Sequence, residues 1–402
     1  MIMFYKAMIK RGVFMFEQKV DRTGTNAVKI DDAIKETGSI DVIAMSVADM
    51  DFRTSPAVVS RLINLSNHGI YGYTGLSDSY CQTVSDWVLK QYRYQIEQDW
   101  IVFTPRIIQA ISMIVQTETE EGDGIGVMTP LYSPITNAVI ANERKVVASA
   151  LVYRDKSYEI DFEDLERVFQ SGIKLFILVS PHNPTGRVFR KEEVKGLVDL
   201  CRKYGVKLIS DEVHADFIWE STFTSVGQYF EAFDQVYVCV SPSKTFNIPG
   251  VEVSNIIIPN QALRARYQNQ LERLGFHNPN FFAEAALQAA YRESDEWFNL
   301  MKSYVRANRN DTIDFFNEKL TDFDVVKAEG TYLLWIGYQR TGLSEDEIKN
   351  WLVNEAKITA SFGSGFGEDG VGFFRINVGM PMEHLEEALE RMYHTYQKIS
   401  KK

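Results

Sequence analysis

The feature that most constrains the fold is an alternation of short apolar runs and helical patterns in the middle of the chain. The run 174–180 is apolar without interruption at its centre, as in a strand that is buried on both faces. A helical apolar pattern follows over 194–201, and Gly205 stands where a C-terminal cap is expected. Further strands are predicted over 206–210 and 235–240. This order predicts an α/β fold, with a parallel or mostly parallel sheet between helices.

The C-terminal third has a different pattern. Segments 331–336 and 373–378 are predicted strands between helical segments, and a last helix carries an apolar stripe. We therefore expect a large domain over 49–290 and a smaller α+β domain over 291–402. The N-terminal segment 1–48 is expected to belong to the small domain. The stripe of the last helix consists of Leu385, Leu389, Met392 and Tyr396.

Composition excludes several classes of protein. The 402 residues include 43 Lys and Arg against 54 Asp and Glu, and the net charge of −11 speaks against a nucleic-acid partner. No apolar run approaches the roughly 20 residues that span a bilayer, and the N-terminus has no uninterrupted apolar region of a signal peptide. A second start at Met15 would make residues 1–14 an extension. Three scattered cysteines without metal-binding spacing favour a reducing, cytoplasmic location and no metal site. They are Cys81, Cys201 and Cys239.

Polar residues follow three of the predicted strands. Asn183, Asp211 and Lys244 stand at or just after the ends of the strands 174–180, 206–210 and 235–240. Ligands of parallel sheets bind beyond the carboxyl ends of the strands, so these side chains can meet in one crevice. A buried lysine beside an acid and an amide suggests Schiff-base chemistry, because burial lowers the pKa of the amine and makes it nucleophilic. Each residue alone has a simpler explanation: a surface lysine, a helix N-cap, and an Asn-Pro turn.

Together these residues resemble a known family. The runs 180–188 (SPHNPTGRV), 210–217 (SDEVHADF) and 241–250 (SPSKTFNIPG) resemble fold-type I pyridoxal phosphate enzymes of the class I/II aminotransferase superfamily. The subgroup that the chain resembles is the MalY/PatB-type C–S lyases, also called cystathionine β-lyases. The similarity extends from about residue 21 to the C-terminus. Further matching pieces are 21–26 (DRTGTN), 47–52 (VADMDF), 69–74 (GIYGYT), 329–333 (EGTYL) and 372–377 (GFFRIN).

The resemblance implies a large cofactor-binding domain with a mostly parallel sheet of seven strands, a smaller α+β domain, and pyridoxal 5′-phosphate as the cofactor. Lys244 would join the cofactor aldehyde covalently and, once displaced by substrate, remove the α-proton. Asp211 would pair with the pyridine nitrogen and keep it protonated. Asn183 would hydrogen-bond the phenolic oxygen, and its bond to Pro184 is expected to be cis, as in many relatives.

The resemblance assigns further residues to cofactor and substrate. Tyr132 would stack on the ring, and the backbone amides of Ile107 and Ile108 would cradle the phosphate. Arg375 would grip the substrate α-carboxylate, unless it is a surface arginine on a strand. Tyr73 would reach the phosphate of the neighbouring subunit's cofactor, which implies a homodimer with shared active sites. His214 is typical of the lyase-like subgroup, the alternative being a helix-start or packing histidine. Two candidate phosphate-binding hydroxyls are Ser241 and Ser243.

The chain also departs from the subgroup at Ser46, Arg106, Ser133 and Glu252. Arg106 would either add a charge near the phosphate or point to solvent, and Glu252 would point away from a phosphate. A run at 365–370 fits GxGxxG, but the predicted strand after it and its two acids speak against a nucleotide site. A loop on the substrate side is the better interpretation.

The expected activity is C–S β-lysis of cystathionine or a related L-cysteine S-conjugate to a thiol, pyruvate and ammonia. The alternative is an aminotransferase that uses the same residues on an amino acid and a 2-oxo acid. A non-catalytic regulator is disfavoured because Lys244, Asp211, Asn183 and Arg375 are all present. The expected partners are a small amino-acid substrate and a second copy of the chain, with neither nucleic acid nor membrane.

Overall fold

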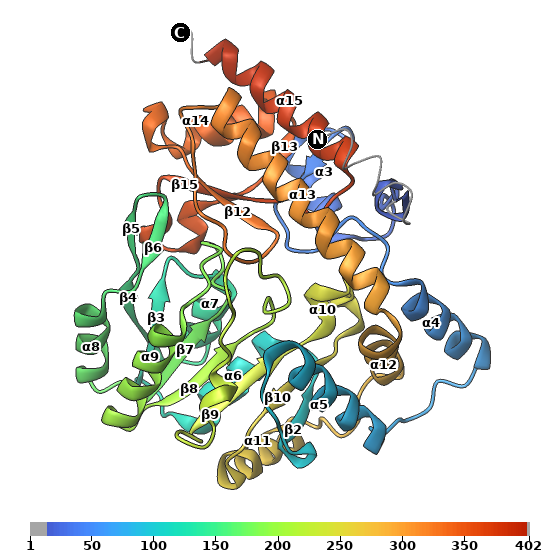
Figure 1. Cartoon of the computed structure of the whole chain (residues 1–402), viewed down its shortest axis with the longest axis vertical. Helices are drawn as coiled ribbons and strands as arrows, with labels where there is room; N and C mark the ends of the chain where they lie inside the picture. Colours follow the sequence, from blue (N-terminus) through green and yellow to red (C-terminus); the bar gives the residue numbers. More distant parts are fainter. Residues whose placement is uncertain (1–13, 400–402) are drawn as a thin grey trace.

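The computed structural model describes residues 14–399. The question of an extension over residues 1–14 therefore falls, except for Phe14, outside the described residues. Two sheets organise the chain, a large one in its middle and a smaller one formed by the C-terminal third (Figure 1). No helix among residues 14–399 has the length and apolarity needed to cross a bilayer.

The large sheet has seven strands in the order β2-β10-β9-β8-β7-β3-β4. Only β10 runs antiparallel to its neighbours, so the sheet is mostly parallel, as predicted. Its strands are β2 (Ile101–Thr104), β3 (Gly124–Thr129), β4 (Lys145–Ala150), β7 (Leu175–Val179), β8 (Lys207–Asp211), β9 (Val236–Val240) and β10 (Ser254–Ile257).

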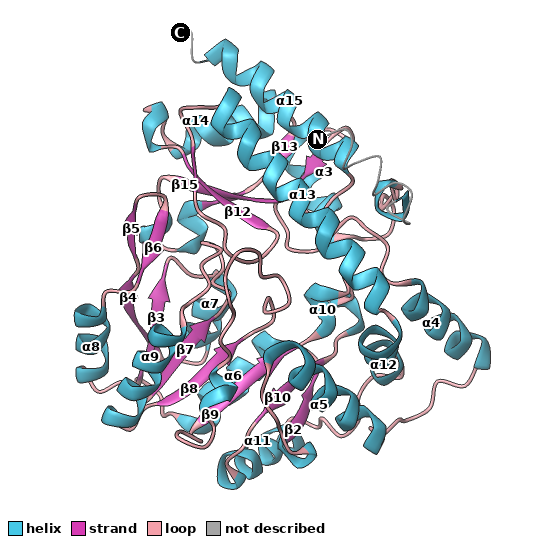
Figure 2. Ribbon diagram, in the orientation of Figure 1, coloured by secondary structure: helices cyan, strands magenta, loops and turns pink. Residues whose placement is uncertain are grey.

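Both faces of this sheet are buried because helices cover each of them (Figure 2). Alternate residues of one strand point to opposite faces, so Leu175 and Ile177 pack with one group of helices and Phe176 and Leu178 with the other. The first group is α6 (Ile107–Glu118), α7 (Ser133–Ala141) and α11 (Gln261–Arg273). The second group includes α5 (Asp78–Tyr92), α8 (Phe162–Gln170) and α9 (Lys191–Tyr204). The uninterrupted apolar run 174–180 is thus explained by burial on two sides.

The second sheet is antiparallel, in the order β11-β12-β15-β14. Its strands are β11 (Asp324–Val325), β12 (Leu333–Gly337), β14 (Ser361–Phe362) and β15 (Phe373–Asn377). The N-terminal segment joins this part of the molecule, since β1 (Ile43–Ala44) pairs in parallel with β13 (Ile358–Thr359). A two-stranded hairpin is formed by β5 (Val152–Arg154) and β6 (Ser157–Glu159). The domain limits near 48 and 290 remain predictions.

The other α-helices are α2 (Phe14–Glu17), α3 (Val28–Thr37), α4 (Pro56–His68), α10 (Pro242–Thr245), α12 (Ala283–Glu293), α13 (Asp295–Lys319), α14 (Glu345–Lys349) and α15 (Met382–Ile399). Single turns of 3₁₀-helix are η1 (Gln98–Trp100), η2 (Val226–Tyr229), η3 (Pro249–Val251), η4 (Gln339–Thr341), η6 (Gly363–Phe366) and η7 (Glu368–Gly370), and η5 (Asn350–Glu355) is a π-helix.

The predicted elements of the middle and the C-terminus are confirmed. Strands β7, β8, β9, β12 and β15 cover the predicted runs to within two residues, and α9 ends at Gly205 in the left-handed conformation. The predicted stripe of α15 is buried along its whole length.

Candidate active site

The carboxyl ends of the parallel strands bring the predicted residues to one edge of the large sheet. Strand register places Val179 opposite Asp211 and Asp211 opposite Cys239, so the segments that follow β7, β8 and β9 start side by side. Asn183 lies after β7, Asp211 ends β8, and Lys244 lies in α10 directly after β9. The geometry expected for a crevice at the strand ends is therefore present.

Lys244 points into this crevice rather than to solvent. Its Nζ donates a hydrogen bond to the backbone carbonyl oxygen of Ala48 at 2.7 Å. Burial lowers the pKa of this amine to about 8, helped by the positive charge of Arg375 and opposed by the carboxylates of Asp49 and Asp211. An amine with this pKa is partly neutral near neutral pH and can act as nucleophile or base.

Asp211 is a buried carboxylate that contacts no cationic side chain among the described residues. Within the described residues its side chain accepts one hydrogen bond, from the backbone N–H of Val213 at 3.2 Å, and forms no ion pair. Burial raises its pKa to about 6, against that hydrogen bond and the charge of Lys244. No helix begins at this residue, so the helix N-cap interpretation is wrong. A buried acid with no cation in direct contact favours a cationic ligand group beside it.

His214 lies three residues further on, in the turn that follows β8. It is 3% exposed, and its Nδ1 has no hydrogen-bond partner among residues 14–399. Burial holds its pKa well below the ordinary value, so the ring is neutral. Its ring centroid lies 6.0 Å from that of Tyr332. The residue does not start a helix, and its orphaned nitrogen is free to meet a ligand.

Arg375 extends from β15 of the small sheet toward the same crevice. Its Nη1 donates to Oδ1 of Asn183 at 2.7 Å, and its Nη2 donates to the carbonyl of Ser46 at 2.9 Å and to Oγ of Ser361 at 3.1 Å. The side chain is 4% exposed, so the interpretation as a surface arginine is wrong. Its Nε has no partner among the described residues. This guanidinium is therefore available to an anionic group such as a carboxylate.

Tyr132 closes another side of the crevice after β3. Its backbone N–H donates to the carbonyl of Asn183 at 3.2 Å, and burial raises the pKa of its hydroxyl. The run 365–370 lies alongside: the Phe366 ring is 5.0 Å from the guanidinium carbon of Arg375. This run forms single 3₁₀ turns rather than the start of a helix, which fits a loop on the substrate side. The peptide bond between Asn183 and Pro184 is cis.

The predicted phosphate site is the N-terminus of helix α6, whose first backbone amides have no hydrogen-bond partner among the described residues. Helix α6 begins at Ile107 without a side-chain cap, and no hydrogen bond to the amides of Ile107 or Ile108 is found among the described residues. The hydroxyl of Ser241 is already engaged, because it donates to the carbonyl of Val253 at 2.7 Å and accepts from the amide of Ser243 at 3.1 Å. Ser241 thus caps α10, whereas no bond of the Ser243 hydroxyl is found in the described part of the chain.

Two departures from the subgroup meet beside this cradle. Arg106, at the N-cap of α6, forms an ion pair with Glu252. The Arg106 side chain is 68% exposed and the Glu252 side chain 39% exposed, so both face the surface. The charge of Glu252, which would repel a phosphate, is therefore paired with that of Arg106.

Tyr73 is the one predicted site residue that the structure does not bring to this crevice. It is 98% exposed in the extended segment between α4 and α5 (Figure 1).

Three other groups in the crevice carried no signal in the sequence. The carbonyl of Ala48 accepts from Lys244 and, at 2.9 Å, from the hydroxyl of Tyr332, and Ser361 binds Arg375. Tyr332 lies within the matching piece 329–333, but no pattern assigned it a role.

Comparison with known proteins identifies the family. The model of the family "Aminotransferase class I and II" matches residues 40–392. Cystathionine β-lyase PatB of Bacillus subtilis is 35% identical over 94% of this chain and 98% of its own length. Protein MalY of Escherichia coli is 30% identical over 94% of this chain and 97% of its own. The structure of cystalysin from Treponema denticola, which contains pyridoxal 5′-phosphate, superposes with a TM-score of 0.92 at 31% identity over 96% of this chain and 99% of that one. The chain therefore belongs to the class I and II aminotransferase family.

The crevice fits pyridoxal phosphate on its own chemistry. A buried carboxylate without a cation suits a protonated ring nitrogen, and a partly neutral lysine amine suits an aldehyde. The unpaired Nδ1 of His214 offers a further contact to a polar ligand. The open start of α6 suits a phosphate. Pyridoxal phosphate carries a complementary group for each of these features.

Proposed function

We propose that this protein is a pyridoxal phosphate-dependent C–S β-lyase that converts an L-cysteine S-conjugate, such as cystathionine, and water to a thiol, pyruvate and ammonia. The observation that carries the proposal is the partly neutral amine of Lys244 in one crevice with the buried Asp211 and Arg375. The similarity to cystathionine β-lyase PatB favours lysis over amino-group transfer.

The bound cofactor supplies an aldehyde for the amino group and a ring that delocalises the electron pair left at Cα. The residues of the chain do the remaining work. Asp211 keeps the ring nitrogen protonated, and Tyr132 and Asn183 hold the ring in place. The open amides of Ile107 and Ile108 bind the phosphate.

Arg375 and Lys244 act on the substrate. The guanidinium of Arg375 binds the α-carboxylate and so fixes the Cα–H bond toward Lys244. The neutral Nζ of Lys244 accepts the α-proton, and the thiolate leaves from Cβ. A thiolate is a stable leaving group, so removal of the α-proton is the demanding step for which the residues are arranged.

The active unit is a homodimer in this proposal. Tyr73 is too exposed to serve its own crevice, and it lies on an extended segment with neighbouring exposed apolar side chains. These side chains are Ile63, Ile70 and Tyr71, at 53%, 68% and 60% exposure. A second copy would cover them and would receive the Tyr73 hydroxyl at its phosphate.

We further propose a cytoplasmic location, in line with three cysteines that are all free.

The test is an incubation of the purified, cofactor-loaded protein with L-cystathionine in the absence of any 2-oxo acid. The proposal predicts thiol and pyruvate in equal amounts. Turnover that requires a 2-oxo acid, with no thiol released, would instead establish the aminotransferase.

A further inference from the structure

The segment 46–52 passes beside Lys244, and the side chains of Asn247 and Asn377 hold its backbone. The side-chain amide of Asn247 donates to the carbonyls of Met50 and Phe52, both at 2.8 Å, and its oxygen accepts from the Met50 amide at 2.9 Å. Asn377 donates to the carbonyls of Val47 and Asp49, both at 2.7 Å. The carbonyl between these two, that of Ala48, is the acceptor of Lys244.

A cluster of four charges lies next to that carbonyl. Asp49 binds Arg22 through two hydrogen bonds of 2.7 and 3.3 Å, and its Oδ1 lies 3.6 Å from Nζ of Lys29. Asp51 binds the same two cations, each at 2.9 Å. The Lys29 side chain is fully buried. The family-like runs 21–26 and 47–52, to which the sequence analysis assigned no role, contact each other in this cluster.

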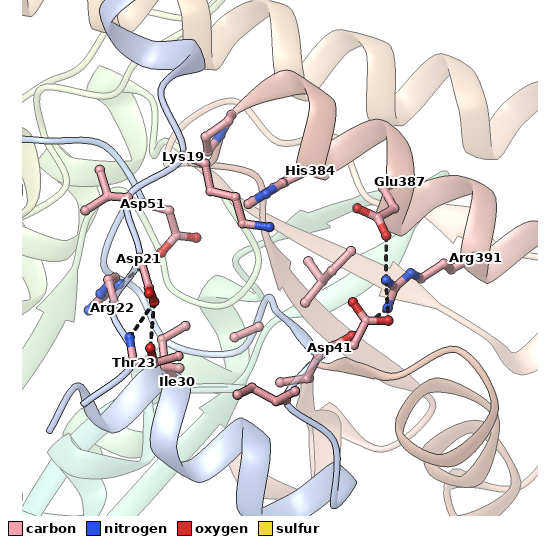
Figure 3. Close-up of a pocket in the computed structure, with 16 residues that line it drawn as sticks. Lys19, Asp21, Arg22, Thr23, Ile30, Asp41, Asp51, His384, Glu387 and Arg391 are labelled. Atoms are coloured by element: carbon pink, nitrogen blue, oxygen red, sulfur yellow. Dashed lines mark hydrogen bonds and ion pairs between the residues drawn. The ribbon is translucent and has the colours of Figure 1, made fainter. Parts of the chain in front are cut away.

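The charged cluster borders two cavities. Arg22 and Asp51 line a cavity of about 140 Å³ between the N-terminal segment and α15, shown in Figure 3. Asp49 and Asp51, together with Arg22 and Lys29, line a second cavity of about 460 Å³. Asp49 directly follows Ala48, whose carbonyl oxygen accepts the hydrogen bond of Lys244, so it is the carboxylate next to the backbone contact of the lysine.

We propose that Asp49 is a positioning residue that stabilises the protonated form of the nitrogen carried by Lys244, while Arg22 and Lys29 hold the carboxylate in place. This proposal rests on the proposed function of the site. A fixed carboxylate favours a nearby cation, whether that cation is the free ammonium or the protonated nitrogen of the cofactor-bound lysine.

The charges that face Lys244 support this assignment. Burial lowers the pKa of the amine, and Asp49 is the strongest of the opposing charges, ahead of Asp211, whereas Arg375 acts in the same direction as burial. Burial works against ionisation of Asp49, but the hydrogen bond from Arg22 and the charges of Lys29 and Lys244 nevertheless lower its pKa. Asp51 stands three residues after Ala48, whereas Asp49 follows it directly.

Two further titratable side chains pack near the amine, and both are uncharged. Burial lowers the pKa of His214 and raises that of Tyr332. Neither therefore supplies the negative charge that Asp49 supplies.

The experiment is a pH titration of the visible absorption band of the cofactor-loaded protein between 300 and 500 nm, which reports protonation of the nitrogen and not turnover. Asp49→Asn keeps the shape of the side chain and removes its charge, and we expect the midpoint to fall by about 1 pH unit. Asp51→Asn is the matched control, since it loosens the same ion pairs, and its midpoint should stay at the wild-type value.

A wild-type midpoint in Asp49→Asn, or an equal fall in Asp51→Asn, would overturn the proposal. Should Asp49→Asn not fold, Arg22→Met gives the opposite sign: one neutralising cation is lost and the midpoint should rise, whereas an unchanged or lower midpoint contradicts the role of Asp49. Absence of any visible band from loaded wild-type protein would instead defeat the proposed function itself.

Discussion

At the scale of single residues, the account depends on charges that burial leaves without partners. Asp211→Asn removes the charge of a buried carboxylate and keeps its size. We expect the protein to retain the cofactor and turnover to fall at least about 100-fold, the scale of losing one preorganised charge in a site. The measurement is the kcat for thiol release.

A neighbouring acid provides the control for this variant. Glu212 is equally buried, and burial raises its pKa to about 7, but it accepts hydrogen bonds from Ser210 and Val226. Glu212→Gln should turn over close to the wild-type rate. Wild-type rates in Asp211→Asn would remove Asp211 from the proposed site.

Arg375 is expected to act on binding through the substrate carboxylate. Charge-assisted hydrogen bonds contribute about 1.5–3 kcal/mol, so Arg375→Ala should raise KM for amino-acid substrates about 10- to 100-fold. S-conjugates of cysteamine, which lack the carboxylate, should be used equally poorly by both proteins. An unchanged KM in the variant would show that the carboxylate binds elsewhere.

At the scale of elements, the site depends on the packing that fixes the strand ends. Gly126 lies in β3, where an added Cβ would come within 2.5 Å of the Phe176 ring and 2.6 Å of Ile173 Cδ1. Gly126→Ala should therefore lower the free energy of unfolding by about 1–3 kcal/mol through overpacking. The measurement is the urea midpoint of the cofactor-free protein.

Gly250→Ala is the matched control, because no atom lies within 4 Å of an added Cβ there. Its urea midpoint should match wild type. An equal loss in the two variants would mean that the packing of β3 against β7 does not set the stability.

The sequence predicted those elements whose burial leaves a periodic signal. The runs that became β7, β8 and β9 are apolar because both of their faces are covered, and residues at their ends could be placed by strand order alone. The segment 46–52 could not be predicted in this way, because side chains distant in the sequence hold it through its backbone. The orientation of the Tyr332 side chain likewise depends on the backbone of Thr331, whose φ of 68° lies in the left-handed region. No sequence pattern predicts that conformation for a threonine.

At the scale of the whole molecule, we expect a second copy to cover the exposed apolar segment around Tyr73. Light scattering of the purified protein should give twice the 46.0 kDa of one chain. Tyr73→Phe should keep that mass and lose cofactor about tenfold more readily, since one hydrogen bond to the phosphate is removed. A monomer with full activity would contradict the shared site.

The most direct measurement maps the covalent attachment of the cofactor. The purified, loaded protein is reduced with borohydride, digested and examined by mass spectrometry. The account predicts that the reduced cofactor is found on the peptide that contains Lys244, and on no peptide of the Lys244→Ala variant. Attachment to another lysine, or none in a fully loaded protein, would contradict it.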